Sequence, residues 1–317
     1  MPVAVLAVIA AVVFGSADFL GGMAAKHLRS LLVTALSAFS GLALLVVAML
    51  VLGTQWRPGD ALLGALSGVL SVAAVGLLYA CLAIGPMSIL SPLTAVVSAL
   101  VPLLWGLLVN HEALSALSWT GLALALGATV LVGFVPGEKV VRPSARGLLM
   151  AVGSGTAIGG FMIIMSNTSA ASGVLPLIFN RGVNGIITTV IVLVTTVAAI
   201  RRGRPLSGAL AAEGPQLGAT PDGRADLEHA RAHADPAPMR ARAWWIAIAA
   251  GLVDATANTM TLVALRSGDL GIVSALIAMY PAGTILLASI VLRERIAGVQ
   301  WLGLGLAVAS GVLLAVG

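Results

Sequence analysis

Long apolar runs, separated by short polar stretches, make up most of the chain. A bilayer hydrocarbon core is about 30 Å thick, and a helix needs roughly 20 apolar residues to cross it. Cutting the sequence at charged and turn residues leaves ten apolar segments of about this length. They predict membrane helices at residues 3–25, 31–52, 61–84, 87–109, 116–135, 145–166, 174–199, 243–265, 270–292 and 298–316. The pattern therefore predicts an all-α membrane protein with ten transmembrane helices.

One long polar stretch interrupts this pattern, at residues 201–242. It is rich in Pro, Gly, Ala and charge and has no apolar periodicity, so we expect a disordered loop. His229 and His233 stand four residues apart within it, but nothing nearby completes a set of metal ligands. We predict no metal and no other cofactor.

Composition excludes several classes of protein. Hydrophobic residues make up 59% of the chain and charged residues 9%, whereas a soluble domain carries about 25% charge. The net charge of +5 comes from residues that lie between apolar runs, without interleaved aromatics, so we expect a lipid bilayer rather than nucleic acid as the partner. A single cysteine, Cys81, excludes a disulfide framework.

The two halves of the sequence resemble each other. "EALSALSWTG" from Glu112 matches "ERIAGVQWLG" from Glu294 in its Glu, Trp and Gly, and "LLYACLAIG" matches "MTLVALRSG" further upstream. Five helices per half is an odd number, so the halves must cross the membrane in opposite directions. We therefore predict two inverted repeats, at residues 1–136 and 144–317, the second interrupted by the 201–242 loop.

Lysine and arginine indicate the orientation. Fourteen of the 17 fall in four loops, at residues 26–29, 139–146, 201–242 and 293–295. By the positive-inside rule these loops are cytoplasmic, which places both termini outside.

Three charged residues fall inside predicted membrane helices: Asp18, Arg181 and Asp254. Such a charge costs roughly 2.5 to 3.5 kcal/mol on insertion scales, so these residues usually face the bundle interior or a water-filled cavity. At about 1.5 Å per residue, Arg181 and Asp254 differ in depth by only about 5 Å. They are the leading candidates for an ion pair, which either orients a substrate or serves as a buried structural salt bridge.

Polar residues surround this predicted pair. Asn180 and Asn184 are one helical turn apart, and Asp254, Asn258 and Thr261 share one helix face. We predict that Asn180, Asn258 and Tyr280 contact a substrate; the alternative is that the amides and hydroxyls join helix to helix.

Asp18 stands about seven residues before Lys26, in "GSADFLGG". Its carboxylate either reaches the cytoplasmic headgroups or lines the cavity, where loss of hydration would favour the protonated form and allow it to carry a proton. The second half has "GSGTAIGG" in the comparable helix, without an acid. The asymmetry favours a role for Asp18 in proton coupling.

Prolines and acids mark other positions in both halves. Pro92, Pro102 and Pro281 each remove a backbone donor within a predicted helix, and interrupted helices in both halves indicate the binding region. Glu112 and Glu294 are expected to cap the following helices or to pair with loop cations. No Ser/His/Asp set, Cys/His cluster or HExxH lies at membrane depth, so we do not expect an enzyme.

The sequence resembles the EamA family of the drug/metabolite transporter superfamily over nearly its whole length. The sharpest part is "YPAGTILLASIVLRERIAGVQWLGLGLAVASGVLL", which carries the family's pattern of Pro, Glu, Gln and Gly, as listed here by position: Pro281, Glu294, Gln300, Gly303 and Gly311. In the first half Glu112 is kept, but Ala99 stands thirteen residues before it and the proline is at Pro102. Family members are often drawn with cytoplasmic termini, which conflicts with the Lys and Arg distribution.

The resemblance implies an alternating-access transporter with a cavity between the halves. We therefore expect a proton-coupled exporter of small metabolites or amino acids in the inner membrane. In this hypothesis Asp254 and Arg181 orient the substrate or gate the cavity, and Asp18 carries the proton. An uncoupled permease and a non-transporting membrane scaffold are the alternatives. A monomer and a homodimer are both compatible with the sequence.

Overall fold

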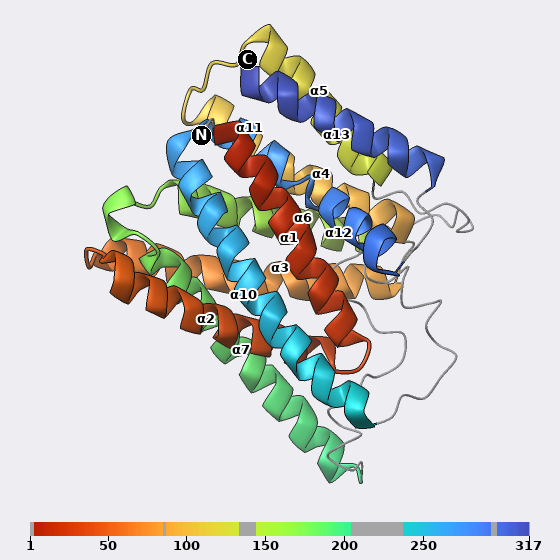
Figure 1. Ribbon diagram of the computed structural model, residues 1–317. Coiled ribbons are helices and arrows are strands. Elements are labelled where there is room, and N and C mark those ends of the chain that lie inside the picture. The colour runs from red at the N-terminus through yellow and green to blue at the C-terminus, as the bar shows by residue number, and fades with distance from the viewer. Residues whose placement is uncertain (1–2, 85–86, 133–143, 204–236, 293–296, 317) are drawn as a thin grey trace.

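The computed structural model describes residues 3–84, 87–132, 144–203, 237–292 and 297–316, and within them it is built from helices (Figure 1). The helices are α1 (Val3–Ala25), α2 (Ser30–Leu52), α3 (Pro58–Ile84), α4 (Met87–Leu108), α5 (Ala116–Val132), α6 (Ala145–Ser166), η1 (Ala170–Ser172), α7 (Leu175–Arg201), α10 (Ala237–Ser267), α11 (Leu270–Ile277), α12 (Tyr280–Leu287), η2 (Ala288–Leu292) and α13 (Gly298–Val316). The predicted all-α class is confirmed.

Eight of the described segments are long and apolar enough to cross a membrane. Two further apolar helices, Pro92–Leu108 and Ala116–Val132, are shorter. Each of the ten predicted segments corresponds to a helix or a broken helix of the structure. Most boundaries agree to within three residues, because charges and turn residues mark the helix ends. His229 and His233 lie outside the described residues, as does Glu294.

The prediction differs from the structure in two places. α10 begins at Ala237, so the last six residues of the predicted 201–242 loop are helical. The predicted helix at 270–292 is broken into α11, α12 and the π-helical turn η2. Pro281 explains the first break, since it has no N–H and its ring displaces the carbonyl four residues earlier, at Ile277, where α11 ends.

The helices pack in a regular order across the molecule. α5 lies beside α13 at one edge and α2 beside α7 at the other, with α1, α3, α6 and α10 between them (Figure 1). α1 packs against α10 and α12, while α6 packs against α3 and α4. Correspondingly, α2 contacts α10 and α7 contacts α3.

Hydroxyl side chains join several of these helices. Ser37 and Ser40 of α2 donate to the carbonyls of Ala247 and Ile248 in α10, at 3.0 and 3.1 Å. Ser154 of α6 likewise donates to Ala74 of α3, at 2.8 Å. In a bilayer, such bonds and close van der Waals contact replace the hydrophobic effect as the source of helix association.

A close backbone approach occurs where α1 crosses α12. A Cβ atom on Gly15 would lie 2.6 Å from the backbone nitrogen of Thr284 and 2.8 Å from the carbonyl carbon of Gly283. The Thr284 hydroxyl donates to the Gly15 carbonyl at 3.2 Å. At the edge pair, Gly303 admits Val132 in the same way, whereas Gly305 faces open space. The glycines of "GSADFLGG" therefore include one that packing strictly requires.

Gly15→Ala should destabilise the protein by about 1 to 3 kcal/mol, because the added methyl group meets backbone atoms that have no room to move. Gly76→Ala in α3 is the matched control, since its Cβ would meet nothing within 4 Å. Thermal unfolding in detergent should show a lower Tm for Gly15→Ala than for Gly76→Ala. Equal Tm values would contradict the close approach.

Candidate substrate cavity

A cavity of about 260 Å³ lies between the helices that contribute the intramembrane charges. Its walls come from α1, α2, α3, α6, α7, α10, α11 and the first residue of α12. The apolar side chains in the lining are Phe14, Ala17, Val33, Ala74, Val75, Leu78, Ile158, Phe161, Met162, Ala250 and Ile277. The polar and charged ones are Asp18, Thr34, Ser37, Ser71, Asn180, Arg181, Asn184, Asp254, Asn258, Thr261 and Tyr280. We call this the central cavity.

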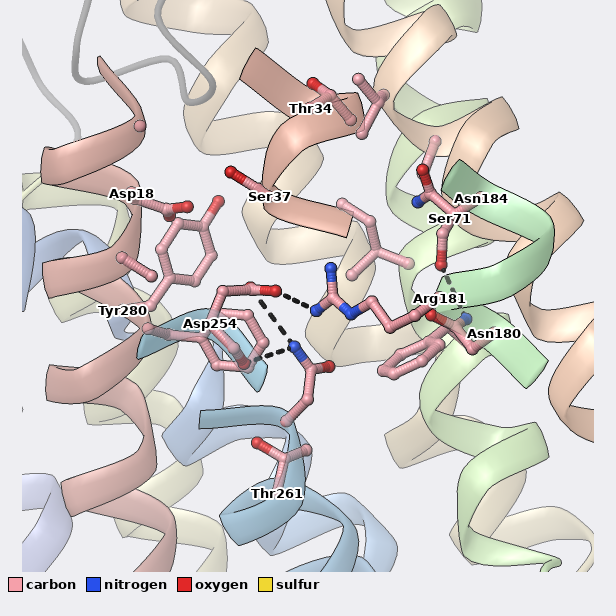
Figure 2. Close-up of a pocket in the computed structure, with 18 of the residues that line it drawn as sticks. Asp18, Thr34, Ser37, Ser71, Asn180, Arg181, Asn184, Asp254, Thr261 and Tyr280 are labelled. Atoms are coloured by element: carbon pink, nitrogen blue, oxygen red, sulfur yellow. Dashed lines mark hydrogen bonds and ion pairs between the residues drawn. The ribbon is translucent and has the colours of Figure 1, made fainter. Parts of the chain in front are cut away.

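Arg181 and Asp254 form an ion pair across the central cavity, from α7 to α10 (Figure 2). The Arg181 Nη2 donates to Asp254 Oδ2. Both side chains are mostly buried, with exposed fractions of 12% and 19%. The predicted contact is confirmed. Its role towards a substrate remains a prediction.

Asn258 fixes the Asp254 side of the pair. Its Nδ2 donates to the Asp254 backbone carbonyl at 2.9 Å and to Oδ1 at 3.3 Å. Asp254 therefore accepts hydrogen bonds on both carboxylate oxygens, one from a guanidinium and one from an amide. Mutual attraction and hydrogen bonding are the conditions under which a buried charge pair is tolerated, and the carboxylate meets both, whereas the Arg181 Nε is buried without a hydrogen-bond partner.

Asn180 serves the packing of α7 on α3. Its Nδ2 donates to Ser67 Oγ at 2.8 Å. It also donates to Ser71 Oγ at 3.2 Å (Figure 2). The Asn180 side chain is buried, although the residue also lines the cavity. The amide nitrogen of Asn180 therefore joins helix to helix, which is the alternative that the sequence raised. Contact with a substrate remains a prediction for this residue.

Asp18 and Tyr280 lie on one side of the central cavity, from α1 and α12 (Figure 2). The structure thus places Asp18 in the lining of the cavity, the second of its two expected positions. All six predicted site residues, which stand far apart in the sequence, share the lining of this one cavity. Their roles in binding or proton coupling are untested by this placement.

Of the three prolines predicted to mark the binding region, only Pro281 stands beside the central cavity. Pro92 and Pro102 lie within α4, and neither is in the cavity lining. Pro281 stands next to Tyr280 at the start of α12, and the break before it brings Ile277 and Tyr280 to the cavity wall. The interruption marks the cavity in the second half only, among the residues that the structure describes.

Sequence reasoning missed several lining residues, including Phe14, Thr34, Ser37 and Ser71. Ser and Thr are common in membrane helices, and these carry no local signal that separates a cavity position from a packing position. Asn184 and Thr261, noted in the sequence as polar stripes, do reach the lining. Their Oδ1 and Oγ1 atoms are buried without a hydrogen-bond partner.

The apolar helices identify a multi-pass membrane protein with a polar cavity at its centre. Residues 231–316 match the EamA-like transporter family, which confirms the resemblance seen in the sequence for that part of the second half. No curated protein matches the chain.

Solved structures support the fold. One match, described only as "Crystal structure of protein", has a TM-score of 0.70 at 15% sequence identity. The alignment covers 98% of this chain and 95% of that one. At this identity the likeness concerns the fold alone, but it extends over the whole chain.

Replacing one partner of the ion pair, by Arg181→Gln or Asp254→Asn, should destabilise the protein by about 3 to 5 kcal/mol, because the other charge is left buried without a counter-ion. The double variant should lose less than the sum of the two single losses. Thermal unfolding of the four proteins measures the coupling. Thr256→Val, on the exposed face of α10, is the control and should leave Tm unchanged. Strictly additive losses would contradict the pairing.

Proposed function

We propose that this protein is a secondary active transporter, a proton-coupled exporter of small metabolites or amino acids that works by alternating access in the inner membrane. The observation that carries the proposal is the Arg181–Asp254 pair in the wall of a 260 Å³ cavity. A membrane protein that only needed stability could fill this space with apolar side chains at lower electrostatic cost. The EamA match supports transport rather than catalysis.

The proposed architecture is two inverted five-helix repeats, with both termini outside. Its support is the pairing of helix contacts: α1 on α10 has its counterpart in α6 on α3, and α2 on α10 in α7 on α3. The pairs α2–α7 and α5–α13 each join helices at equivalent positions of the two halves. The central cavity, which takes residues from both halves, would then lie between the repeats.

In the proposed cycle the chemistry is divided among three groups. Arg181 and Asp254 orient a small polar or amphipathic substrate, and Asn258 positions Asp254. The largely apolar remainder of the lining suits a substrate with a hydrocarbon part. Asp18, on the part of the wall formed by α1, gains a proton in one access state and releases it in the other.

Asp18→Asn should abolish transport driven by a pH gradient, because the amide has no proton to exchange. Proteoliposomes with an imposed gradient and a radiolabelled substrate measure this. Uptake that keeps its full gradient dependence in Asp18→Asn would show that the proton role is wrong. Equal rates of the unaltered protein with and without a gradient would favour an uncoupled permease.

A thermal-shift screen of amino acids and related metabolites on the purified protein should identify a substrate class. A ligand at about 100 times its Kd stabilises the folded state by about 2.7 kcal/mol, which is readily measured as a rise in Tm. The rise should disappear in Asp254→Asn and persist in Thr256→Val. A scaffold would show no ligand-dependent rise, and its Arg181 and Asp254 variants would change stability alone.

A further inference from the structure

A second cavity of about 280 Å³ lies towards the opposite end of α1 from Asp18. It is lined by Val3, Ala4, Ala113, Leu114, Ser115, Ser118, Gly268, Asp269, Ile272, Val273, Leu314 and Ala315. We call it the end cavity. Its residues belong to the end of the bundle formed by residues 53–57, 109–115, 167–174 and 268–269, which we call the low-charge end. Along α1, Ala4 and Phe14 are ten residues apart, so the two cavities are separated by roughly 15 Å.

The short helix α11 stands between the two cavities. Asp269, Ile272 and Val273, at its start, line the end cavity, whereas Ile277, at its end, lines the central cavity. On the other side, the central cavity extends to Gly21 and Thr34, about one turn from the α1–α2 loop. In this structure α11 therefore forms part of the barrier between the central cavity and the low-charge end.

α11 and α12 are two separate helices and not one continuous helix. A turn at Ala278 and Met279 separates the two helices, and Pro281 removes a hydrogen bond that would continue α11. α12 is held against α1 through Gly15 and Thr284. The break allows α11 to move while α12 keeps its place.

Glu112 holds the free end of α11. Its Oε1 accepts the backbone N–H of Leu270 at 2.9 Å, and its Oε2 accepts that of Gly271 at 3.2 Å. These are unsatisfied donors of the first helical turn, where a carboxylate also meets the positive end of the helix dipole. Asp269, at the N-cap position, makes no side-chain cap. The sequence led us to expect that Glu112 caps the following helix, α5, or pairs with loop cations; it caps α11 instead, in the other half of the chain.

The surroundings of Glu112 are shaped for this contact. Its own N–H donates to the Gly106 carbonyl at 2.9 Å, and a Cβ on Gly106 would collide with the Glu112 carboxylate. The carboxylate of Asp269 lies close enough to be affected, since burial and the Glu112 charge raise the pKa of Asp269 above its usual value. Because two acidic side chains lie next to the start of α11, the contact between Glu112 and α11 should be sensitive to replacement of the Glu112 carboxylate.

Arg266 and Asp60, also at the low-charge end, bond to elements other than α11. Arg266, near the end of α10, donates to Thr168 Oγ1 at 2.7 Å and to the Gly173 carbonyl at 2.8 Å. Asp60 accepts the N–H of Ser169 at 3.2 Å. These bonds fix α3 and α10 to the α6–α7 loop. Glu112 is the acidic side chain that the structure shows bonded to α11.

We propose that α11 is the gate between the central cavity and the low-charge end, and that the Glu112 carboxylate is the latch that holds it closed. The inference deepens the proposed transport function, since a gate at this end is what a cavity needs to change its side of access. Glu112 is a positioning residue: it acts on the cavity through the backbone of α11.

Cysteine labelling tests the latch without a substrate. In a Cys81→Ala background, Ala17→Cys places a thiol in the lining of the central cavity. A membrane-impermeant maleimide applied from the low-charge end should label it slowly. With Glu112→Gln, labelling from that end should become about tenfold faster, because the loss of the charge-assisted cap bonds lowers the population of the closed state. Arg57→Cys, exposed at the same end, calibrates the sidedness.

Asp60→Asn is the matched control. It neutralises another carboxylate that accepts a backbone N–H at the same end but does not touch α11. Labelling of Ala17→Cys should stay slow in this variant. An unchanged rate in Glu112→Gln, or an equal acceleration in Asp60→Asn, would overturn the latch.

A covalent lock tests the gate even if Glu112→Gln does not fold. Ala113→Cys and Asp269→Cys both face the end cavity and are exposed, so a short bis-thiosulfonate can join them before Ala17→Cys is probed. The link should suppress labelling from the low-charge end, and a reductant should restore it. Labelling unaffected by the link would overturn the gate while leaving the proposed transport intact. Conversely, a lack of ligand binding and transport would contradict the proposed function and leave both labelling results standing.

Discussion

A bilayer provides no water to satisfy a buried charge, so the attraction between Arg181 and Asp254 constrains everything around it. The two groups stand on α7 and α10, which must be held at one separation for the contact to persist. Serine bonds join α2 to α10, and Asn180 joins α7 to α3. The packing of four helices therefore serves the geometry of one ion pair.

Close packing and an open cavity coexist because different residues provide them. Glycine allows backbone contact at the α1–α12 crossing, and small residues such as Ala7, Ala10 and Ala24 are fully buried on α1. Near the middle of the bundle, Phe14, Phe161 and Tyr280 are too large to interlock and surround a space instead. That space is where the charged side chains meet.

The sequence was most informative about helices and least about contacts between them. Apolar segments bounded by charges predicted most helix ends to within three residues, since membrane thickness sets the helix length. The price of burying charge identified Asp18, Arg181 and Asp254, all of which line the central cavity. The break at Ala278–Met279 was visible only as a proline, because one proline either bends a helix or ends it, depending on its neighbours.

The partner of Glu112 was beyond local reasoning for a different reason. An acid after a helix is usually interpreted as the cap of the next one, whereas Glu112 reaches a helix 158 residues later in the chain. Likewise, nothing local distinguished Asn180, whose amide nitrogen joins helices, from Asn258, whose amide positions Asp254. Both assignments depend on which helices become neighbours, and that is a property of the fold.

The anchoring of α12 on α1 has a consequence for the electrostatics of the proposed cycle. Asp18 and Tyr280 belong to these two joined helices, and the ion pair belongs to the bundle beside them. A gate that rotates about residues 278–279 would leave all of these groups in place. The charges would then stay in place while access to the cavity changes, so neither ion would have to be dehydrated again during each turnover.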